Sequence, residues 1–110
     1  MLTDLRAGTF RTHMNTFFSI HLSPVTDLAV ELVEVTEKGG MDRQQPSAAA
    51  HQERFSVVFR GARERLLEQA MYHMQHDQLG DLELFLVPVG QDQTCVYYEA
   101  VFNRLRQADA

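Results

Sequence analysis

Residues 82–89 read LELFLVPV, the most apolar stretch of the chain. Its two alternating faces are Leu82, Leu84, Leu86 and Pro88 on one side and Glu83, Phe85, Val87 and Val89 on the other. This period of two predicts a β-strand. Both faces become apolar toward the middle, which predicts burial on both sides there. Because Pro88 has no backbone N–H to donate, it marks an edge position or the end of the strand.

The same alternation recurs on either side of this stretch. It predicts further strands at residues 52–60 (QERFSVVFR), 71–76 (MYHMQH) and 96–103 (VYYEAVFN). Residues 77–81 have the composition of a hairpin turn, with Gly80 available for a positive φ, and residues 90–94 form a polar loop. Short turns between successive strands predict an antiparallel meander.

Two other connections differ in length and composition. Gly61 is expected to end the strand at 52–60, and residues 62–70 (ARERLLEQA) are expected to form a single helical turn or an ordered loop. Residues 39–50 (GGMDRQQPSAAA) hold two glycines and a proline, so they are expected to form a long mobile loop. This loop lies inside one domain, because neither flank is large enough to form its own core.

The N-terminal part is less regular. Residues 17–22 (FFSIHL) have strand composition, and residues 3–14 are expected to contain a short helix with Asn15 as a left-handed cap. Residues 26–38 (TDLAVELVEVTEK) fit a helix by the spacing of their apolar residues and a strand by their β-branched content. We favour the strand. Glu31 and Glu34 would then lie on opposite faces unless a β-bulge near residues 32–33, or a solvent-exposed strand end, intervenes.

Composition limits the possible classes of protein. The chain has 110 residues, 45% hydrophobic residues and a formal net charge of −5, which fits one globular domain at residues 1–110. The acidic balance argues against nucleic-acid binding, and no apolar run approaches the ~20 residues of a membrane helix. The N-terminus has no signal-peptide pattern, so the default expectation is a cytoplasmic location without membrane insertion. A single cysteine, Cys95, excludes an internal disulfide and is expected to be a partly buried apolar residue.

These elements together predict a mainly β fold: about six antiparallel strands in a small barrel or sandwich, with a short N-terminal helix. The motifs FSVVFRG (55–61), LELFLVPVG (82–90) and YEAVFN (98–103) resemble those of a small, uncharacterised bacterial domain family of unknown function. The spacing of Tyr72 and Met74 before Leu79-Gly80 is similar as well, although Ala70 stands where a glycine is expected. The resemblance implies a small β-rich fold. It also implies an accessory or assembly role near phage-tail-collar-type proteins.

No arrangement of residues indicates catalysis, a cofactor or a metal. His73 and His76 are three residues apart, so on a strand they face opposite sides and cannot bind one ion. His13, His21 and His51 are scattered along the sequence. We therefore predict no catalytic, cofactor-binding or metal-binding residues.

Five residues remain as candidates for interaction or structural roles: Arg60, Tyr72, His73, Tyr98 and Glu99. Glu99 is expected to pair across strands with an arginine such as Arg60. The surplus apolar strand faces favour a non-enzymatic interaction or assembly module that associates with itself or with a protein partner. The alternative is a small-ligand-binding barrel or enzyme with a pocket near Tyr72, Tyr98 and Glu99.

Overall fold

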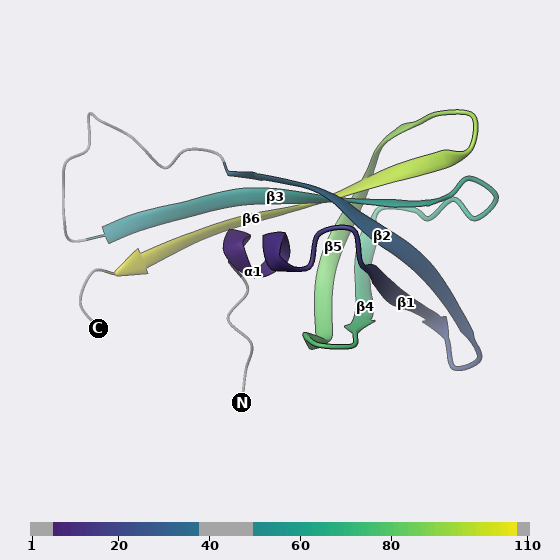
Figure 1. Ribbon diagram of the computed structural model, residues 1–110, viewed down its shortest axis with the longest axis horizontal. Coiled ribbons are helices and arrows are strands. Elements are labelled where there is room, and N and C mark those ends of the chain that lie inside the picture. Colours follow the sequence, from purple (N-terminus) through teal and green to yellow (C-terminus); the bar gives the residue numbers. More distant parts are fainter. Residues whose placement is uncertain (1–5, 38–49, 108–110) are drawn as a thin grey trace.

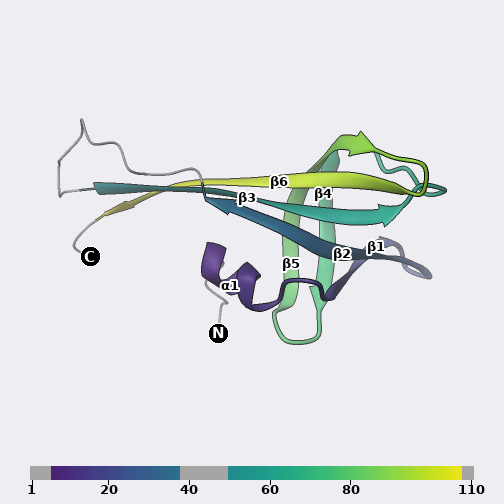
Figure 2. The same cartoon turned by 45° about the horizontal axis from the view of Figure 1, so that its top comes forward.

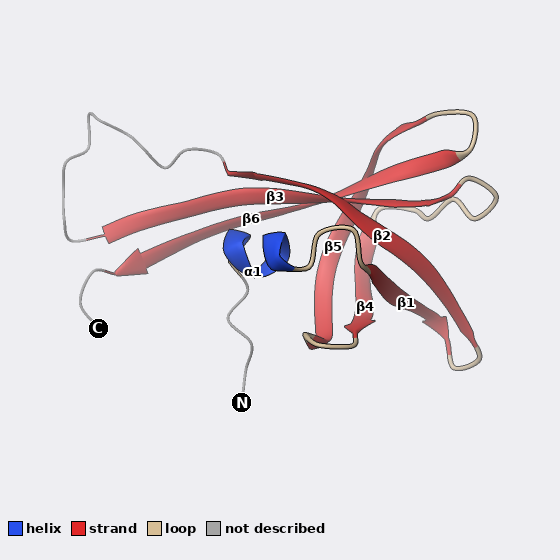
Figure 3. Cartoon of the chain, viewed as in Figure 1, coloured by secondary structure: helices blue, strands red, loops and turns tan. Residues whose placement is uncertain are grey.

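The computed structural model describes residues 6–37 and 50–107, with side chains for 6–37 and 54–102. The chain forms a closed antiparallel barrel with the strand order β1-β2-β3-β6-β5-β4 and one short helix (Figures 1 and 3). The elements are α1 (Ala7–Thr12), β1 (Phe17–Ser23), β2 (Thr26–Glu37), β3 (Ala50–Ala62), β4 (Ala70–His76), β5 (Gly80–Gln91) and β6 (Cys95–Gln107). The predicted mainly β fold is confirmed, and of the two predicted architectures the structure is the barrel.

Strands β4, β5 and β6 form the predicted meander, whereas β3 pairs with β6 and not with β4. Residues 63–69 therefore cross one end of the barrel as an ordered loop. The prediction that Gly61 ends the preceding strand is wrong, since β3 runs on to Ala62. A Cβ atom at Gly61 would lie 3.1 Å from Cγ1 of Val30, so a larger residue there would crowd the Val30 side chain.

Of the helix and the strand considered for residues 26–38, the structure has the strand. Residues 26–37 form β2, and its register shifts between Leu32 and Glu34, where the bulge was predicted. The extra residue brings Glu31 and Glu34 to the same outer face, opposite Arg60 and Val58 respectively. The predicted short helix is α1, and Asn15 has the predicted left-handed conformation, with φ of 65°. The loop predicted at 39–50 lies outside the described residues, except that Ala50 already belongs to β3.

The interior is filled by inward-facing side chains of all six strands and of α1. Phe10 of α1 is fully buried against an aromatic cluster, with ring centroids 5.4 Å from Phe102, 6.0 Å from Phe55 and 6.5 Å from Phe18. The helix packs on β2 and β3. It thereby closes one end of the barrel (Figures 1 and 2).

The prediction that β5 is buried on both faces is wrong. Leu82, Leu84 and Leu86 point inward and are buried, but the outward-facing Phe85 is 46% exposed. Its cross-strand partner Met71 is 60% exposed. Because α1 packs on β2 and β3 instead, nothing among the described residues covers this outer side of β4 and β5.

Strands β3 and β6 extend beyond the closed part of the barrel. Thirteen consecutive residue pairs join them without a register shift. Their far halves run out beyond the barrel as a two-stranded ribbon, over α1 in Figure 1. Among the described residues, no helix is both long and apolar enough to cross a membrane.

Candidate functional site

At the end of the barrel opposite α1, residues 63–69 are held in place by two tyrosines. The buried hydroxyl of Tyr98 accepts a hydrogen bond from the backbone N–H of Leu67 (2.9 Å) and donates one to the carbonyl of Arg65 (3.3 Å). The hydroxyl of Tyr72 donates to the carbonyl of Glu68 (2.6 Å), and burial raises the pKa of this tyrosine. This segment is therefore a fixed wall that projects from the barrel.

The ladder between β4 and β5 stops at Ala70 and Leu86, but β5 continues to Gln91. From residue 87 to residue 91 this strand pairs with β6 on one side, and no described strand pairs with its other side. Between this unpaired edge and the segment 63–69 lies a groove of about 560 Å³, which we call the β5 groove. Its lining residues are Leu66, Leu67, Glu68, Gln69, Pro88, Gly90, Gln91 and Val96.

The β5 groove is apolar at its floor and has one charged lining residue, Glu68. Leu67 and Val96 are buried beneath it, whereas Leu66 is 63% exposed on the wall. Asp92 follows the last lining residue of β5, and backbone N–H groups of Thr94 and Cys95 lower the pKa of its carboxyl group. A ligand with an apolar group and a positive charge would match this lining.

The structure brings two of the five predicted candidates together. Tyr72 and Tyr98 both hold the wall of the β5 groove. Glu99 lies on the opposite face of β6 from Tyr98, next to Val58 and Val87 in the ladders. His73 is exposed on the outer face of β4.

The expected pairing of Arg60 with Glu99 is wrong. Arg60 lies opposite Glu31 and Tyr97, and its Nη2 donates to Oε1 of Glu31 at 2.5 Å. This carboxylate raises the pKa of the Arg60 guanidinium. The bulge in β2 brings Glu31 into this register, so the ion pair joins β2 to β3 on the outer face.

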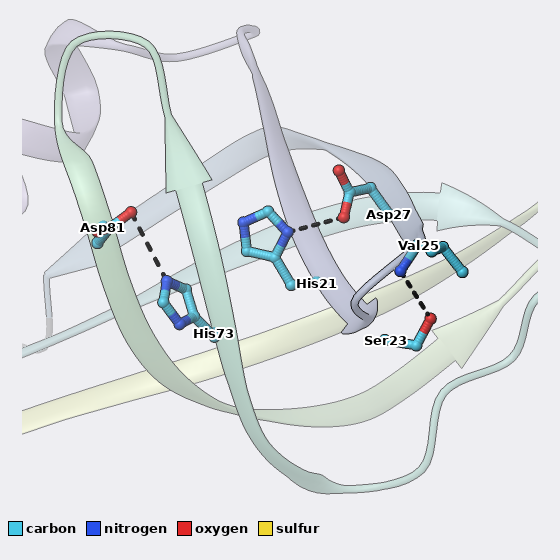
Figure 4. A network of polar contacts seen from close by, with 6 residues as sticks. All are labelled: His21, Ser23, Val25, Asp27, His73 and Asp81. Carbon is cyan, nitrogen blue, oxygen red and sulfur yellow. Dashed lines mark hydrogen bonds and ion pairs between the residues drawn. The ribbon is translucent and has the colours of Figure 1, made fainter.

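His73 and His76 face opposite sides of β4, as predicted. Each meets a second histidine from the N-terminal part, which the sequence did not reveal. The rings of His73 and His21 lie 5.1 Å apart on the outer face, where Nδ1 of His21 is 2.7 Å from Oδ1 of Asp27 (Figure 4). Nε2 of His73 is 3.6 Å from Oδ1 of Asp81.

The hydrogen bond to Asp27 raises the pKa of His21, so this imidazole is stabilised in its charged form. No three His, Cys, Asp or Glu side chains in the described part of the chain are grouped closely enough to hold a metal ion. The outer network therefore consists of two His–Asp contacts, His21 with Asp27 between β1 and β2 and His73 with Asp81 between β4 and β5.

The inner pair consists of His13 and His76, with ring centroids 4.7 Å apart. Nδ1 of the buried His76 accepts hydrogen bonds from the backbone N–H groups of Gln78 (3.0 Å) and Leu79 (3.2 Å). Its proton is therefore on Nε2, which lies 2.9 Å from the hydroxyl of Thr16, and that hydroxyl donates onward to the carbonyl of His13. Burial and, secondarily, His13 lower the pKa of His76, so this imidazole is neutral.

One of three comparisons with known proteins finds a match. No curated protein and no solved structure matches the chain. A family model described as a domain of unknown function, DUF6916, matches residues 5–102, which include the helix and nearly all of the barrel. The expected membership of an uncharacterised family is confirmed, and the chain belongs to the DUF6916 family.

Proposed function

We propose that this protein is a non-enzymatic interaction module that docks an extended segment of another protein in the β5 groove. The unpaired edge of β5 beside an apolar groove carries the proposal. Backbone N–H and C=O groups of such an edge can pair with an added strand, while side chains of that strand occupy the groove. Exposed Met71 and Phe85 form a ladder pair near the start of this edge, on the outer face of β4 and β5.

The charge beside the groove favours one kind of segment. Glu68 lines the groove and ionised Asp92 lies beside it, so a lysine or arginine next to an apolar residue fits best. Gln69 and Gln91 can bond the backbone of the incoming segment. The setting we propose is an accessory or assembly role of the kind that the resemblance to domains near phage-tail-collar-type proteins implies.

A small-molecule ligand is the alternative occupant. The volume of the groove falls within the roughly 300–1,000 Å³ of ligand pockets. However, the hydroxyl of Tyr98 is already bonded to the wall, and Glu99 lies on the other face of β6. Few polar side chains remain to orient a small ligand, so the geometry favours a peptide.

The probe for this function is a phage-displayed library of random linear peptides, panned against the whole protein. We expect enriched peptides to combine an apolar residue with a basic one. A synthetic peptide from this set should bind Leu66→Asp at least about tenfold more weakly by fluorescence anisotropy, because a charge enters the apolar wall. The matched control is Val25→Asp, which makes the same kind of change at an exposed site in the β1–β2 turn.

Equal binding to both variants would show that the peptide docks elsewhere and would overturn the proposal. Failure to enrich any peptide sequence would overturn it as well. NMR signals of the Leu67 and Gly90 amides distinguish the two occupants. If a small-molecule fragment shifts these signals and the peptide does not, the ligand alternative is favoured.

A further inference from the structure

A second unpaired strand edge lies on β6, and it is longer than the unpaired edge of β5. All thirteen of its residues pair with β3, but β5 pairs with it only over residues 96–99. From residue 100 to residue 107, no strand among the described residues takes the other side of β6. Along these eight residues, every second residue directs its backbone N–H and C=O groups to this edge, which is therefore a template for strand addition.

This edge lacks two of the devices that usually protect an edge strand. The unpaired part of β5 is short, residues 87–91, and contains Pro88 and a register shift before Gly90, so it offers room for a short docked segment but not for a long regular ladder. Residues 100–107 (AVFNRLRQ) contain no proline, and the pairing with β3 is regular throughout. Val101 lies on this stretch and is 63% exposed on the outer face.

We infer that β6 pairs with β6 of a second copy of this chain, antiparallel and around a twofold axis. Such an interface is isologous, so one edge supplies both halves of the ladder. It joins β2, β3 and β6 of the two copies into one continuous six-stranded sheet. It also completes the ribbon, which as two strands alone is only marginally stable.

The arginines at the end of the strand select a register. A twofold axis perpendicular to the sheet must pass through a pair of identical residues, because opposite residues share a face. Centred on Asn103, the pairing uses residues 100–106 and places Arg104 opposite Phe102 and Arg106 opposite Ala100. Centred on Arg104, it would place two arginines directly opposite each other, which is destabilising.

The oligomeric state of the whole protein tests the inference. We expect a dimer by sedimentation velocity and by light scattering coupled to size exclusion. Val101→Lys should raise the dimer dissociation constant at least about tenfold, since a lysine on an edge strand opposes pairing. The matched control Val25→Lys, far from this edge, should leave it unchanged. A monomer at every concentration, or a dimer unaffected by Val101→Lys, would overturn the inference.

The register has its own test. In a Cys95→Ser background, Asn103→Cys places two thiols at the twofold axis, and mild oxidation should join the two chains covalently. Val25→Cys in the same background should remain uncrosslinked. A dimer that Val101→Lys disrupts but that Asn103→Cys fails to crosslink would overturn the register centred on Asn103. The β5 groove takes no part in this dimer, so Leu66→Asp, which tests peptide docking, should leave dimerisation intact.

Discussion

The two ends of the barrel are closed by different means. At one end, α1 inserts Phe10 among three other phenylalanines, and His76 ties the turn between β4 and β5 to the start of β1. At the other end, the hydroxyl groups of Tyr72 and Tyr98 hold the segment 63–69, and the β5 groove stays open beside it. The first end is packed with aromatic side chains, whereas the second is fixed by hydrogen bonds and leaves Leu66 exposed beside the groove.

The largest effect is expected at the packed end. Phe10→Ala removes a fully buried ring and should lower the free energy of unfolding by about 3–5 kcal/mol in a denaturant titration. Phe17→Ala is the matched control, because Phe17 is largely exposed and should cost less than about 1 kcal/mol. Equal losses in the two variants would show that α1 does not close the barrel as described.

At the open end, a single hydroxyl group should have a smaller effect. Tyr98→Phe leaves the buried N–H of Leu67 without its partner and should cost about 1–3 kcal/mol. Hydrogen exchange at Leu67 should become faster, since the wall of the groove loses its anchor. Tyr97→Phe removes a hydroxyl that bonds the exposed Asp92 and should cost less. Unchanged exchange at Leu67 would contradict this role for Tyr98.

The packed end should also depend on pH. The pKa of His76 in the folded protein lies below the usual 6.5, so on acidification the unfolded chain takes up a proton first. The free energy of unfolding should therefore fall as the pH drops below about 6.5, by at most about 1.4 kcal/mol per pH unit for this one proton. The fall should continue down to the pKa of the folded state.

His76→Asn is the matched variant for this pH dependence, because its amide oxygen can still accept from the turn but does not titrate. His21 has the opposite sign. Its pKa is raised, so its contribution is present below pH 6.5 and is lost as the pH rises through the folded value. The difference between the pH profiles of wild type and His76→Asn isolates the buried residue, and parallel profiles would contradict its assignment as neutral.

The smallest change in stability is expected for Leu66→Asp. The side chain is largely exposed, so the melting temperature should stay close to that of wild type, with a change in unfolding free energy within about 0.5 kcal/mol. This variant nevertheless should lose peptide binding at the β5 groove. A marked loss of stability would mean that Leu66 belongs to the core of this end and not to a docking surface.

Local patterns predicted a large part of the fold. Alternation located four of the six strands, residue composition located the other two, and the spacing of Glu31 and Glu34 located the bulge in β2. The pairing of β3 with β6, the closure of the barrel and the partners of Arg60 depend on contacts between distant residues, and a period of two does not encode them. The same is true of the β5 groove, because it arises where one ladder stops before its neighbour.

The histidines show this limit clearly. The odd spacing of His73 and His76 correctly placed them on opposite faces of a strand. That each would meet a histidine of the N-terminal part, His21 outside and His13 inside, follows only from how β1 and α1 pack against β4. The raised pKa of His21 follows mainly from its hydrogen bond to Asp27 of β2, and the lowered pKa of His76 follows mainly from its burial.

Closure of the barrel rests on a short seam. Strand β1 meets β4 through two residue pairs, Ser19 with Gln75 and Ile20 with Met74, which lie more than fifty positions apart in the chain. A nascent chain must expose the edge of β1 until β4 has emerged, so the seam forms late and is slow to find its partner. In the folded protein, the barrel should open first along this seam, before any part of the long β3–β6 ladder is lost.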